Sequence, residues 1–542
     1  MDDIARIGAG PIGLYDLGQL RGIEHRAQAL LAPHTLMQRA GLAAADRARM
    51  LVEMTSQSVR AGAMQPDSQP PPSVLIVAGP GNNGGDAFEC GFHLANSAWR
   101  VTLWMPVPSS AFAADAAQAL ARIRTCNLTV IESSAADECA ALVEQPWSLV
   151  IDGLFGIGLT RPLTGALRAV VDTMNAIDAP LLALDVPSGL NADTGAIPVG
   201  DDQASVCVRA TQTLSFIADK PGLHTADGRD HAGIVRVASL DIDPALLPPA
   251  RALLSQPSLF ATAAKPRAHA SHKGSFGDVM IIGGAAGMVG AALLAGHAAL
   301  KAGSGRVMIG FADPTHAPTY DPQHPELMCR SAALLDFDTA TLVVGPGLST
   351  SETASALVMR ACSSDAPLVL DADALNLVAA SPALAAALQA RAARSLATLL
   401  TPHPLEAARL LGTTAKLIQA DRLTAAGKLA ARFAATVILK GSGTVIADGN
   451  LLAINPTGNP ALATGGTGDV LSGLCGALLA QGWPVRQAAL GAVWIHGAAA
   501  DRLVADGIGP TGVTASEIIE AARAVLNDLI RSAARAAPGA RR

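Results

Sequence analysis

The sequence contains few aromatic and few charged residues. Of its 542 residues, 3% are aromatic and 15% are charged, whereas 50% are apolar and 52 are glycine. This composition suits helices that pack tightly on parallel sheets. The formal net charge is −6, and the sequence has neither a lysine-rich run nor a basic patch with interleaved aromatic residues. It therefore lacks the basic surface expected of a nucleic-acid-binding protein, and small anionic molecules remain as the expected ligands.

Paired cysteines and long apolar runs are missing as well. The seven cysteines include no Cys-x-x-Cys pair and are odd in number, which argues against a disulfide framework or a zinc site. No window of about eighteen residues is free of glycine, proline and charge, and the N-terminus has no basic segment followed by an apolar core. We therefore expect a cytoplasmic protein without a membrane partner.

The length of the chain exceeds what one hydrophobic core usually supports, so at least two domains are expected. Prolines interrupt the sequence periodicity most strongly between Asp243 and Lys273. We predict an N-terminal domain over residues 1–245, a proline-rich linker over 246–270 and a C-terminal domain over 271–535.

Short β-rich runs alternate with alanine-rich helical patterns on both sides of this linker. The runs expected as strands are 74–78, 101–104, 148–151 and 181–184 before it, and 278–282, 341–344, 368–370, 399–400 and 436–439 after it. Such alternation is typical of parallel sheets covered by helices. The predicted fold class is therefore α/β, with two three-layer αβα domains.

A glycine-rich loop follows the first of these runs, in Gly79-Pro-Gly-Asn-Asn-Gly-Gly-Asp86. Such a loop can hold a phosphorylated ligand, although Asn, Gly and Asp also form ordinary turns at low cost. The segment Gly79–Gly84 fits the dinucleotide pattern as well. The next strand ends in Trp104-Met-Pro106 without the carboxylate that would bind a ribose, which disfavours a standard NAD dehydrogenase.

Further polar residues follow other predicted strands of the first half. Asp152 comes directly after one run, and Asp185-Val-Pro-Ser188 follows another. Ligands of open parallel sheets bind at the carboxyl ends of the strands. Amide, carboxylate and hydroxyl oxygens together suit a hard cation. From the residues alone, Asp185 could equally be a structural cap or a catalytic group.

The second half offers a similar set of residues after its strands. Gly465-Gly-Thr-Gly-Asp469 predicts an anion cradle at a helix N-terminus, in which Asp469 accepts a proton from an attacking hydroxyl; the alternative is a closely packed helix start. Lys440-Gly-Ser-Gly-Thr444 adds a second glycine-rich contact for a nucleotide. His403 lies between two prolines and is either a turn residue or a site residue.

In this order the motifs resemble those of the bifunctional NAD(P)H-hydrate repair enzymes. The first half is similar to their epimerase half, the YjeF N-terminal type, through Gln38–Gly41, Asn82–Asp86, Asp152–Pro162, Asp185–Gly189 and Lys220–Gly222. The resemblance implies a Rossmann-like domain with Asp185 as the substrate-contacting acid/base, and a potassium ion (K⁺) held by Asn83, Asp152 and Ser188. It implies that the hydrated dinucleotide is bound by Asn82, Asn83, Gly84, Gly85, Asp86, Gly156, Ile157, Gly158, Leu159, Thr160, Arg161 and Pro162.

The second half is similar to the ADP- or ATP-dependent dehydratase half, which is related to ribokinases. The resemblance rests on His272–Asp278, Gly290–Ala292, Gly345–Gly347, Asp371–Asn376, Thr401–Glu406, Lys440–Thr444 and Thr464–Asp469. It implies a ribokinase-like αβα domain in which Asp469 is catalytic. The substrate-binding residues it implies are Ala291, Gly347, His403 and Asp469, and the nucleotide-binding residues are Lys440, Gly441, Ser442, Gly443, Thr444 and Gly468.

The chemistry implied by the resemblance is repair of NADH and NADPH that have been hydrated across the C5–C6 bond of the nicotinamide ring. The first half would interconvert the two C6 epimers, and the second would phosphorylate the C6 hydroxyl of the S epimer with Mg²⁺ and ADP or ATP and release phosphate. One alternative is a sugar or vitamin kinase fused to a nucleotide-binding domain, and another is a non-enzymatic binding protein. The choice between ADP and ATP, the preference between the hydrates of NADH and NADPH, and a homo-oligomeric state stay open.

Overall fold

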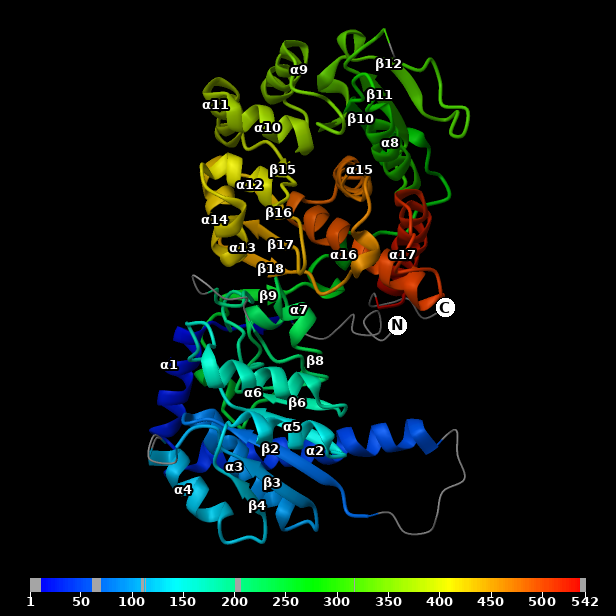
Figure 1. Ribbon diagram of the computed structural model, residues 1–542. Helices are drawn as coiled ribbons and strands as arrows, with labels where there is room; N and C mark the ends of the chain where they lie inside the picture. Colours follow the sequence, from blue (N-terminus) through cyan, green and yellow to red (C-terminus); the bar gives the residue numbers. More distant parts are fainter. Residues whose placement is uncertain are drawn as a thin grey trace. The chain divides into compact units, whose positions relative to one another are not determined.

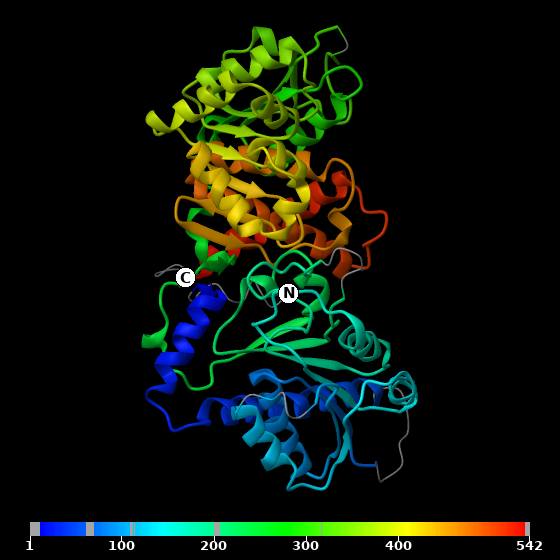
Figure 2. The same ribbon diagram turned by 60° about the vertical axis from the view of Figure 1, so that its left-hand side comes forward.

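The computed structural model describes residues 11–60, 70–108, 112, 114–199, 206–315 and 317–536. The chain divides into two compact units, an N-terminal unit of Gly13–Arg251 and a C-terminal unit that begins at Ala252. Strand β1 (Ile12–Leu14) spans the division between them. Figures 1 and 2 show the elements of each unit in sequence colours.

The N-terminal unit is built on a parallel sheet with the strand order β4-β3-β2-β5-β6-β7-β8. Its strands are β2 (Ser73–Ala78), β3 (Arg100–Trp104), β4 (Thr129–Ile131), β5 (Leu149–Gly153), β6 (Leu181–Leu184), β7 (Gln212–Phe216) and β8 (Ile234–Ala238). Its helices are α1 (Leu17–Gln28), α2 (Thr35–Arg60), α3 (Asn82–Ala95), α4 (Ala114–Ile123), α5 (Ala136–Glu144), α6 (Gly165–Ala176) and α7 (Gly228–His231).

Both faces of this sheet are covered, as the side chains of β2 show. Val74 and Ile76 pack in one core with residues of α2, α3 and α4, whereas Leu75 and Val77 pack in another core with residues of α5 and α6. Successive side chains of a strand point to opposite faces, so a strand buried on both sides reads as a continuous apolar run. The expected three-layer αβα arrangement is confirmed for this unit.

Figure 2 also shows α1 (blue) beside the green segment that ends the unit. Arg26 of α1 donates a hydrogen bond to the carbonyl of Leu246 in this segment, at 2.9 Å.

The sheet of the C-terminal unit has the order β9-β18-β17-β16-β15-β14-β13-β10-β11-β12. Its strands are β9 (Ala252–Leu254), β10 (Asp278–Gly283), β11 (Arg306–Phe311), β12 (Met328–Ser331), β13 (Thr341–Val344), β14 (Leu368–Leu370), β15 (Thr398–Leu400), β16 (Thr436–Leu439), β17 (Val445–Asp448) and β18 (Leu451–Ile454). Its helices are α8 (Val289–Lys301), α9 (Glu352–Ser363), α10 (Ala372–Ala380), α11 (Pro382–Ala393), α12 (Pro404–Leu411), α13 (Ala415–Ala420), α14 (Arg422–Phe433), α15 (Thr467–Ala480), α16 (Val485–Ala505) and α17 (Ala515–Ala536).

Helices cover this second sheet on both faces as well. Val279 and Val343 pack in a core with residues of α8, α15, α16 and α17. Met280 and Leu342 point the other way and are also buried, and α9 and α14 contact β13 and β16. Figure 1 shows the two groups of helices on opposite sides of the strands. The α/β fold class expected for the second half is therefore confirmed.

The predicted strands all form, but the second sheet is not wholly parallel. Strand β17 runs antiparallel to both β16 and β18. Several strands were not expected, among them β4 and β8, whose residues are mostly exposed or half-buried. A strand at the edge of a sheet buries too little surface to show a strong apolar pattern.

The proline-rich segment 246–270 differs from the linker that the sequence predicts. Ala252–Leu254 forms β9, which pairs in parallel with β18, and Pro257 begins a short 3₁₀ helix. Phe260 is fully buried, with its ring centroid 5.9 Å from that of Trp494. Proline is accepted at the first position of a helix, so Pro257 starts a turn within the C-terminal unit. The division between the two units falls between Arg251 and Ala252, inside the predicted linker, and the rest of the segment belongs to the C-terminal unit.

All seven cysteines are free thiols. Within the described residues, no helix is both long enough and apolar enough to cross a membrane.

A fully buried arginine joins three elements of the C-terminal unit. From α11, the guanidinium of Arg391 donates hydrogen bonds to Thr398 Oγ1 at 2.9 Å, to the carbonyl of Ser364 at 2.7 Å and to that of Ala366 at 2.6 Å. These acceptors lie in or just before β14 and β15, where the chain enters these two strands. Since buried carbonyls without donors are costly, Arg391 stabilises the N-terminal ends of β14 and β15.

We therefore expect Arg391→Met to lower the free energy of unfolding of the C-terminal unit by about 3 kcal/mol, because the carbonyls would lose their donors. Urea unfolding followed by circular dichroism measures the change. The control is Arg523→Met on α17, a half-exposed residue paired with Glu520 at 2.7 Å, which should cost less than about 1 kcal/mol. Equal midpoints for both variants would contradict this role of Arg391.

Candidate functional sites

The glycine-rich segment after β2 forms the start of a helix rather than a loop. Asn82–Asp86 are the first residues of α3, and Gly81 precedes them without a side-chain cap. The first backbone N–H groups of a helix have no partner within it, and the helix dipole favours an anion there. A Cβ on Gly79 would lie 1.7 Å from the carbonyl oxygen of Leu154. Only glycine therefore allows this turn to pack against the end of β5.

A cavity of about 930 Å³ opens at this end of the sheet. Of the residues predicted to bind substrate in the N-terminal half, the structure places most on its wall: Asn82, Asn83, Asp86, Gly156, Ile157, Gly158, Leu159, Thr160, Arg161, Pro162 and Asp185. Gly84 and Gly85 are buried instead, and a Cβ on Gly84 would meet the carbonyl of Gly79 at 1.9 Å. These two glycines permit close packing behind the cavity wall.

Asp185 occupies a strained position at the end of β6. Its φ is +67°, in the left-handed region that residues other than glycine rarely adopt. Its Oδ1 lies 2.7 Å from Nζ of Lys220 and accepts a hydrogen bond from the backbone N–H of Phe216 at 3.2 Å. Lys220 is 1% exposed and donates a further hydrogen bond to Ser215 Oγ at 2.6 Å. The carboxylate is thus fixed by a buried ammonium group.

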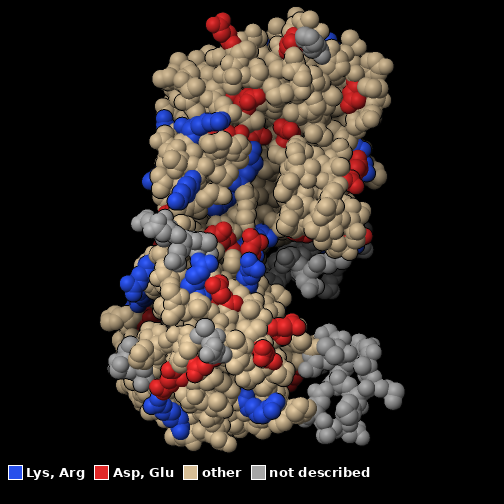
Figure 3. Space-filling model, in the orientation of Figure 1, with Lys and Arg blue, Asp and Glu red and all other residues tan. Residues whose placement is uncertain are grey.

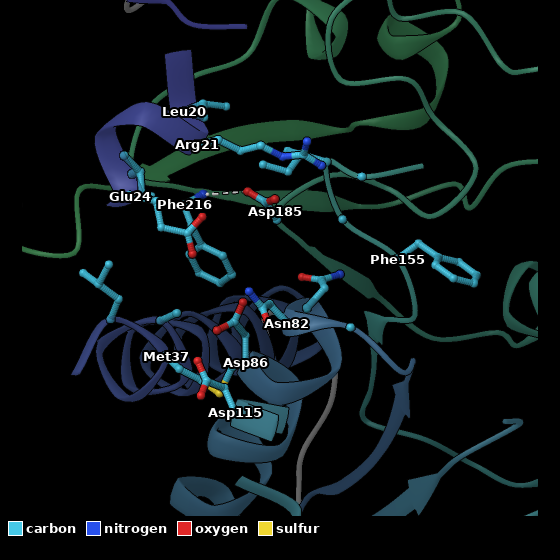
Figure 4. A pocket seen from close by; sticks show the side chains of 18 of the residues that line it. Leu20, Arg21, Glu24, Met37, Asn82, Asp86, Asp115, Phe155, Asp185 and Phe216 are labelled. Carbon is cyan, nitrogen blue, oxygen red and sulfur yellow. Dashed lines mark hydrogen bonds between the residues drawn. The ribbon is translucent and has the colours of Figure 1, made fainter. Parts of the chain in front are cut away.

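Three more carboxyl groups, of Asp86, Glu24 and Asp115, line the cavity with Asp185. Figure 4 shows Asp86 across the cavity from Asp185, and Glu24 of α1 beside them. Burial raises the pKa of Asp86 well above its usual value, and the charges of Asp185, Glu24 and Glu89 add to the effect. Burial also raises the pKa of Glu24, again with a contribution from Asp185. A cavity with several close carboxyl groups favours keeping some of them protonated.

Behind the cavity wall, Asp152 and Ser188 form a buried pair. Ser188 donates to Asp152 from its hydroxyl at 2.6 Å and from its backbone N–H at 2.8 Å. Burial raises the pKa of Asp152 to about 6, although the hydrogen bonds from Ser188 oppose this rise. The backbone N–H of Phe155 donates to Ser188 Oγ at 2.8 Å, which links the pair to the loop at Gly156.

Asn83 lies beside the same loop with both side-chain polar atoms unpaired. Its side chain is buried, and neither Oδ1 nor Nδ2 has a hydrogen-bond partner. A Cβ on Gly156 would lie 3.4 Å from Cγ of Asn83 and 3.1 Å from Oδ2 of Asp185. Asn83 and Asp185 therefore meet at Gly156, next to the Asp152–Ser188 pair. Unpaired buried polar atoms call for a ligand, a water or an ion.

In the C-terminal unit the predicted residues gather where β13, β14, β15 and β16 end. Lys440 follows β16, and its Nζ lies 2.7 Å from Oδ1 of Asp371, which is 1% exposed and precedes α10. A Cβ on Gly468, in the first turn of α15, would lie 3.5 Å from the same Nζ. Lys440 thus connects the end of the sheet with the helix start that carries Asp469.

Figure 3 shows that this face of the unit is hollowed between α12–α14 and α15–α16, with acidic and basic side chains along the hollow.

The electrostatics of this site centre on Asp469 and Lys440. Burial, together with the charge of Asp371, raises the pKa of Asp469 to about 6, and Lys440 opposes the rise. Burial alone would lower the pKa of Lys440, but Asp371 and Glu406 raise it above its usual value. At neutral pH, Asp469 is therefore a carboxylate with a raised affinity for a proton, which is what a general base requires.

His403 is the N-cap of α12, the structural role that the sequence left open. Its Nδ1 accepts hydrogen bonds from the N–H groups of Leu405 at 3.1 Å and Glu406 at 3.4 Å, and Glu406 Oε2 accepts one from the N–H of His403 at 2.8 Å. Burial lowers the pKa of His403 and raises that of Glu406 to about 7. The cap holds the imidazole in place, and its side chain is 45% exposed.

The remaining predicted residues of this unit form two glycine turns. Gly347 has a φ of +58°, and a Cβ there would lie 3.2 Å from Cβ of Ala291. The turn of Lys440, Gly441, Ser442, Gly443 and Thr444 is held by Arg422, which donates to the carbonyls of Leu439 and Lys440 at 3.1 Å each. Gly441 has a φ of +141°, and a Cβ there would lie 2.8 Å from the guanidinium of Arg422. Glycine is therefore required at the center of this turn.

Several site residues were missed by sequence reasoning. Lys220 stood in a recognised motif but without a role, and Arg422 lies in a helix that shows no site pattern. Arg21, Glu24 and Asp115 line the N-terminal cavity from α1 and α4. No local signal marks such residues, because charged positions on amphipathic helices usually face solvent.

Known proteins are similar to both halves of the chain. A family model described as YjeF-related protein N-terminus matches residues 33–222, and one described as NAD(P)H-hydrate dehydratase matches residues 279–523. The chain is 34% identical over 530 residues to a bifunctional NAD(P)H-hydrate repair enzyme of Coxiella burnetii, which covers 95% of this chain and 99% of that relative.

Two further proteins match the C-terminal half. An ADP-dependent (S)-NAD(P)H-hydrate dehydratase of Neisseria meningitidis is 44% identical over 273 residues, which are 49% of this chain and 91% of that relative. The crystal structure of an ADP/ATP-dependent NAD(P)H-hydrate dehydratase from Bacillus subtilis, co-crystallised with ATP and Mg²⁺, has 30% identity and a TM-score of 0.44, and the match covers 51% of this chain and 98% of that chain.

We expect Lys440→Gln to raise the pKa of Asp469 above about 6, because the ammonium group that opposes the rise would be gone. The variant should also lose about 3 kcal/mol of stability, since the buried carboxyl group of Asp371 would lose its partner. A carbon-13 titration of the aspartate carboxyl groups, assigned with Asp469→Asn, measures the first effect. Lys428→Gln on the exposed side of α14 is the matched control. An unchanged Asp469 titration would show that Lys440 does not set its pKa.

Proposed function

The chain belongs to the family of bifunctional NAD(P)H-hydrate repair enzymes, and from that membership we propose which residues of each unit carry its two activities. The protein interconverts the R and S epimers of hydrated NADH and NADPH, and it dehydrates the S epimer to NADH or NADPH at the expense of ADP or ATP. Its N-terminal half is of the YjeF type and its C-terminal half is ribokinase-like. Epimerisation then belongs to the cavity of the N-terminal unit, and dehydration to the glycine turns of the C-terminal unit.

In the N-terminal unit, we assign the hydrated dinucleotide to the cavity beside the start of α3. The N–H groups of Asn82 and Asn83 at the start of α3 would receive its phosphates, and Gly156–Pro162 would form the adjoining wall. The carboxylate of Asp185 would contact the reacting hydroxyl. Its contact with Lys220 Nζ at 2.7 Å would hold the carboxyl group in place to accept the proton of that hydroxyl.

In the C-terminal unit, we assign Asp469 as the base that takes the proton of the C6 hydroxyl when this oxygen attacks the terminal phosphate. Ala291, Gly347 and His403 would hold the hydrated ring, and Lys440–Thr444 with Gly468 would hold the nucleotide. Mg²⁺ bound to the phosphates would neutralise the charge that develops on them. Loss of phosphate from C6 and of a proton from C5 then restores the double bond.

One observation carries these assignments. In each unit, a carboxyl group predicted to be catalytic lies at the end of a strand or the start of a helix, with a lysine close by: Asp185 with Lys220, and Asp469 near Lys440. A proton acceptor close to backbone N–H groups can bind an anionic substrate and take a proton from it. The main alternative function, a simple kinase, does not account for the cavity of the N-terminal unit.

The residues of the N-terminal unit also fit a potassium ion. The unpaired amide of Asn83 and the buried Asp152 carboxylate offer oxygen ligands next to the Ser188 hydroxyl. A cation would compensate the burial that raises the pKa of Asp152 to about 6. We propose that Asn83, Asp152 and Ser188 hold K⁺, which would fix the loop at Gly156. Among the described residues, no group of three or more His, Cys, Asp and Glu is arranged as a metal site.

The assignment of the two activities is tested with absorbance at 340 nm, on a mixture of both NADH-hydrate epimers with Mg²⁺ and ADP or ATP. The wild type should recover all the NADH, and its dehydration rate should rise with pH through about 6 as Asp469 ionises. Asp469→Asn should abolish dehydration but not epimerisation, and Asp185→Asn should recover only the S fraction. Full recovery by Asp469→Asn would remove this residue as the base. No recovery by the wild type with either nucleotide would support the kinase alternative.

The potassium assignment predicts that KCl, but not choline chloride, raises both the epimerisation rate and the melting temperature of the N-terminal unit, since an ion that binds the native state stabilises it. Asn83→Ala should lose both effects. Asn96→Ala, at the exposed C-terminal end of α3, should keep them. The same response of wild type and Asn83→Ala to potassium would place the ion elsewhere.

A further inference from the structure

The N-terminal cavity presents two carboxyl groups with different partners. Asp185 comes from the end of β6 and pairs with the buried Lys220 at 2.7 Å. Asp86 comes from the start of α3 and, within the described part of the chain, its carboxyl group has no hydrogen bond or ion pair. Figure 4 shows the two groups on facing sides of the cavity. One carboxyl group thus has a buried lysine as its partner, and the other is left without a counter-charge.

The surroundings of Asp86 favour its protonated form. Burial raises its pKa well above the usual value, and the nearby charges of Asp185, Glu24 and Glu89 act in the same direction. Lys220 is already engaged by Asp185 and Ser215. His34 also lines the cavity but pairs with Asp115 at 3.3 Å. Two carboxyl groups whose environments separate their proton affinities form an acid and a base.

The substrate requires both kinds of group, and this step rests on the proposed function. C6 of the hydrated ring bears a hydroxyl group and is bonded to the ring nitrogen N1, so it is a hemiaminal carbon. Inversion can proceed when a base removes the hydroxyl proton, the C6–O bond becomes a carbonyl, the C6–N1 bond breaks and an acid protonates N1. Rotation about C5–C6 followed by the reverse steps gives the other epimer. Atoms and electrons balance without any oxidant, reductant or cofactor.

We propose that Asp86 is the general acid of this ring opening and donates its proton to N1, while Asp185 accepts the proton of the C6 hydroxyl. The facing positions of the two carboxyl groups allow one proton to be taken and another given on opposite sides of the bond that breaks. On ring closure the roles reverse, as microscopic reversibility demands. The other carboxyl groups of the cavity are less suited, because Asp115 is 45% exposed and paired with His34, and Glu24 accepts a hydrogen bond from Gln28 at 3.4 Å.

The first test measures conversion of purified R epimer to S epimer by the full-length protein without nucleotide, so that dehydration cannot proceed. Asp86→Asn should lower kcat for epimerisation by about 100-fold or more, the usual contribution of a general acid. It should also remove the decrease in rate that the wild type shows as pH rises and Asp86 loses its proton. Dehydration of pure S epimer with ADP or ATP is the internal control and should be unchanged, which shows that the variant is folded.

Two matched variants identify the group responsible. Asp172→Asn makes the same change of charge on α6, outside the cavity, where Asp172 is 55% exposed and pairs with Arg168 at 3.4 Å, and it should keep the wild-type rate and pH profile. Glu24→Gln should keep the alkaline decrease in rate. If Glu24→Gln loses that decrease and Asp86→Asn retains it, Glu24 is the acid and the proposal for Asp86 is wrong.

An isotope experiment on the wild type tests the route without any variant. Epimerisation in water enriched in oxygen-18 should leave the C6 oxygen unlabelled at early conversion, because ring opening breaks the C6–N1 bond and keeps the C6–O bond. Incorporation of one oxygen-18 per inversion would show that hydroxide leaves instead, and would overturn the proposal. A wild type that does not exceed the spontaneous rate would refute the epimerase function itself, an outcome distinct from the failure of Asp86 as the acid.

Discussion

In each unit, a lysine paired with a carboxylate at the end of a parallel strand is the interaction on which the site depends. Lys220 holds Asp185, and Lys440 holds Asp371, in both cases at 2.7 Å. Removing such charges from water costs several kcal/mol for each ion unless they are paired and hydrogen-bonded. The pairs therefore make it feasible to place charge inside a cavity or between turns that are otherwise apolar and glycine-rich. They also leave a neighbouring carboxyl group without a counter-charge of its own.

That neighbouring group is the one with the altered proton affinity. Asp86 lies opposite the Asp185–Lys220 pair, and its pKa is raised by burial and by the charge of Asp185. Asp469 lies next to the Asp371–Lys440 pair, and its pKa is raised to about 6, largely by burial. The two sites serve different reactions, but in both of them burial beside an ion pair raises the pKa of a carboxyl group. Burial is the main cause of each shift, and the charge of the neighbouring paired carboxyl group adds to it.

Close backbone approach accounts for most of the glycines around these groups. Gly79 packs against the carbonyl of Leu154, and Gly345 would place a Cβ 1.8 Å from the carbonyl of Asp371. The family motifs are thus partly packing motifs, which explains why Gly84 and Gly85 lie behind the cavity wall although the sequence placed them in the binding loop. His403 likewise combines a structural role with a position open to a ligand, since it caps α12 and its side chain remains 45% exposed.

The sequence alone was sufficient for the fold class, the family and the strand ends at which site residues appear, because these follow from local apolar runs and from motifs of fixed spacing. It did not reveal that residues 252–264 complete the C-terminal unit, since pairing of β9 with β18 joins segments about 200 residues apart. Nor could it show that Lys220 serves Asp185, that Asn83 is left unpaired, or that Glu24 reaches the cavity from α1. Those facts arise only when the fold removes particular groups from water and places them beside charges that are distant in the chain. No local sequence pattern contains this desolvation, and it decides which carboxyl groups carry a proton.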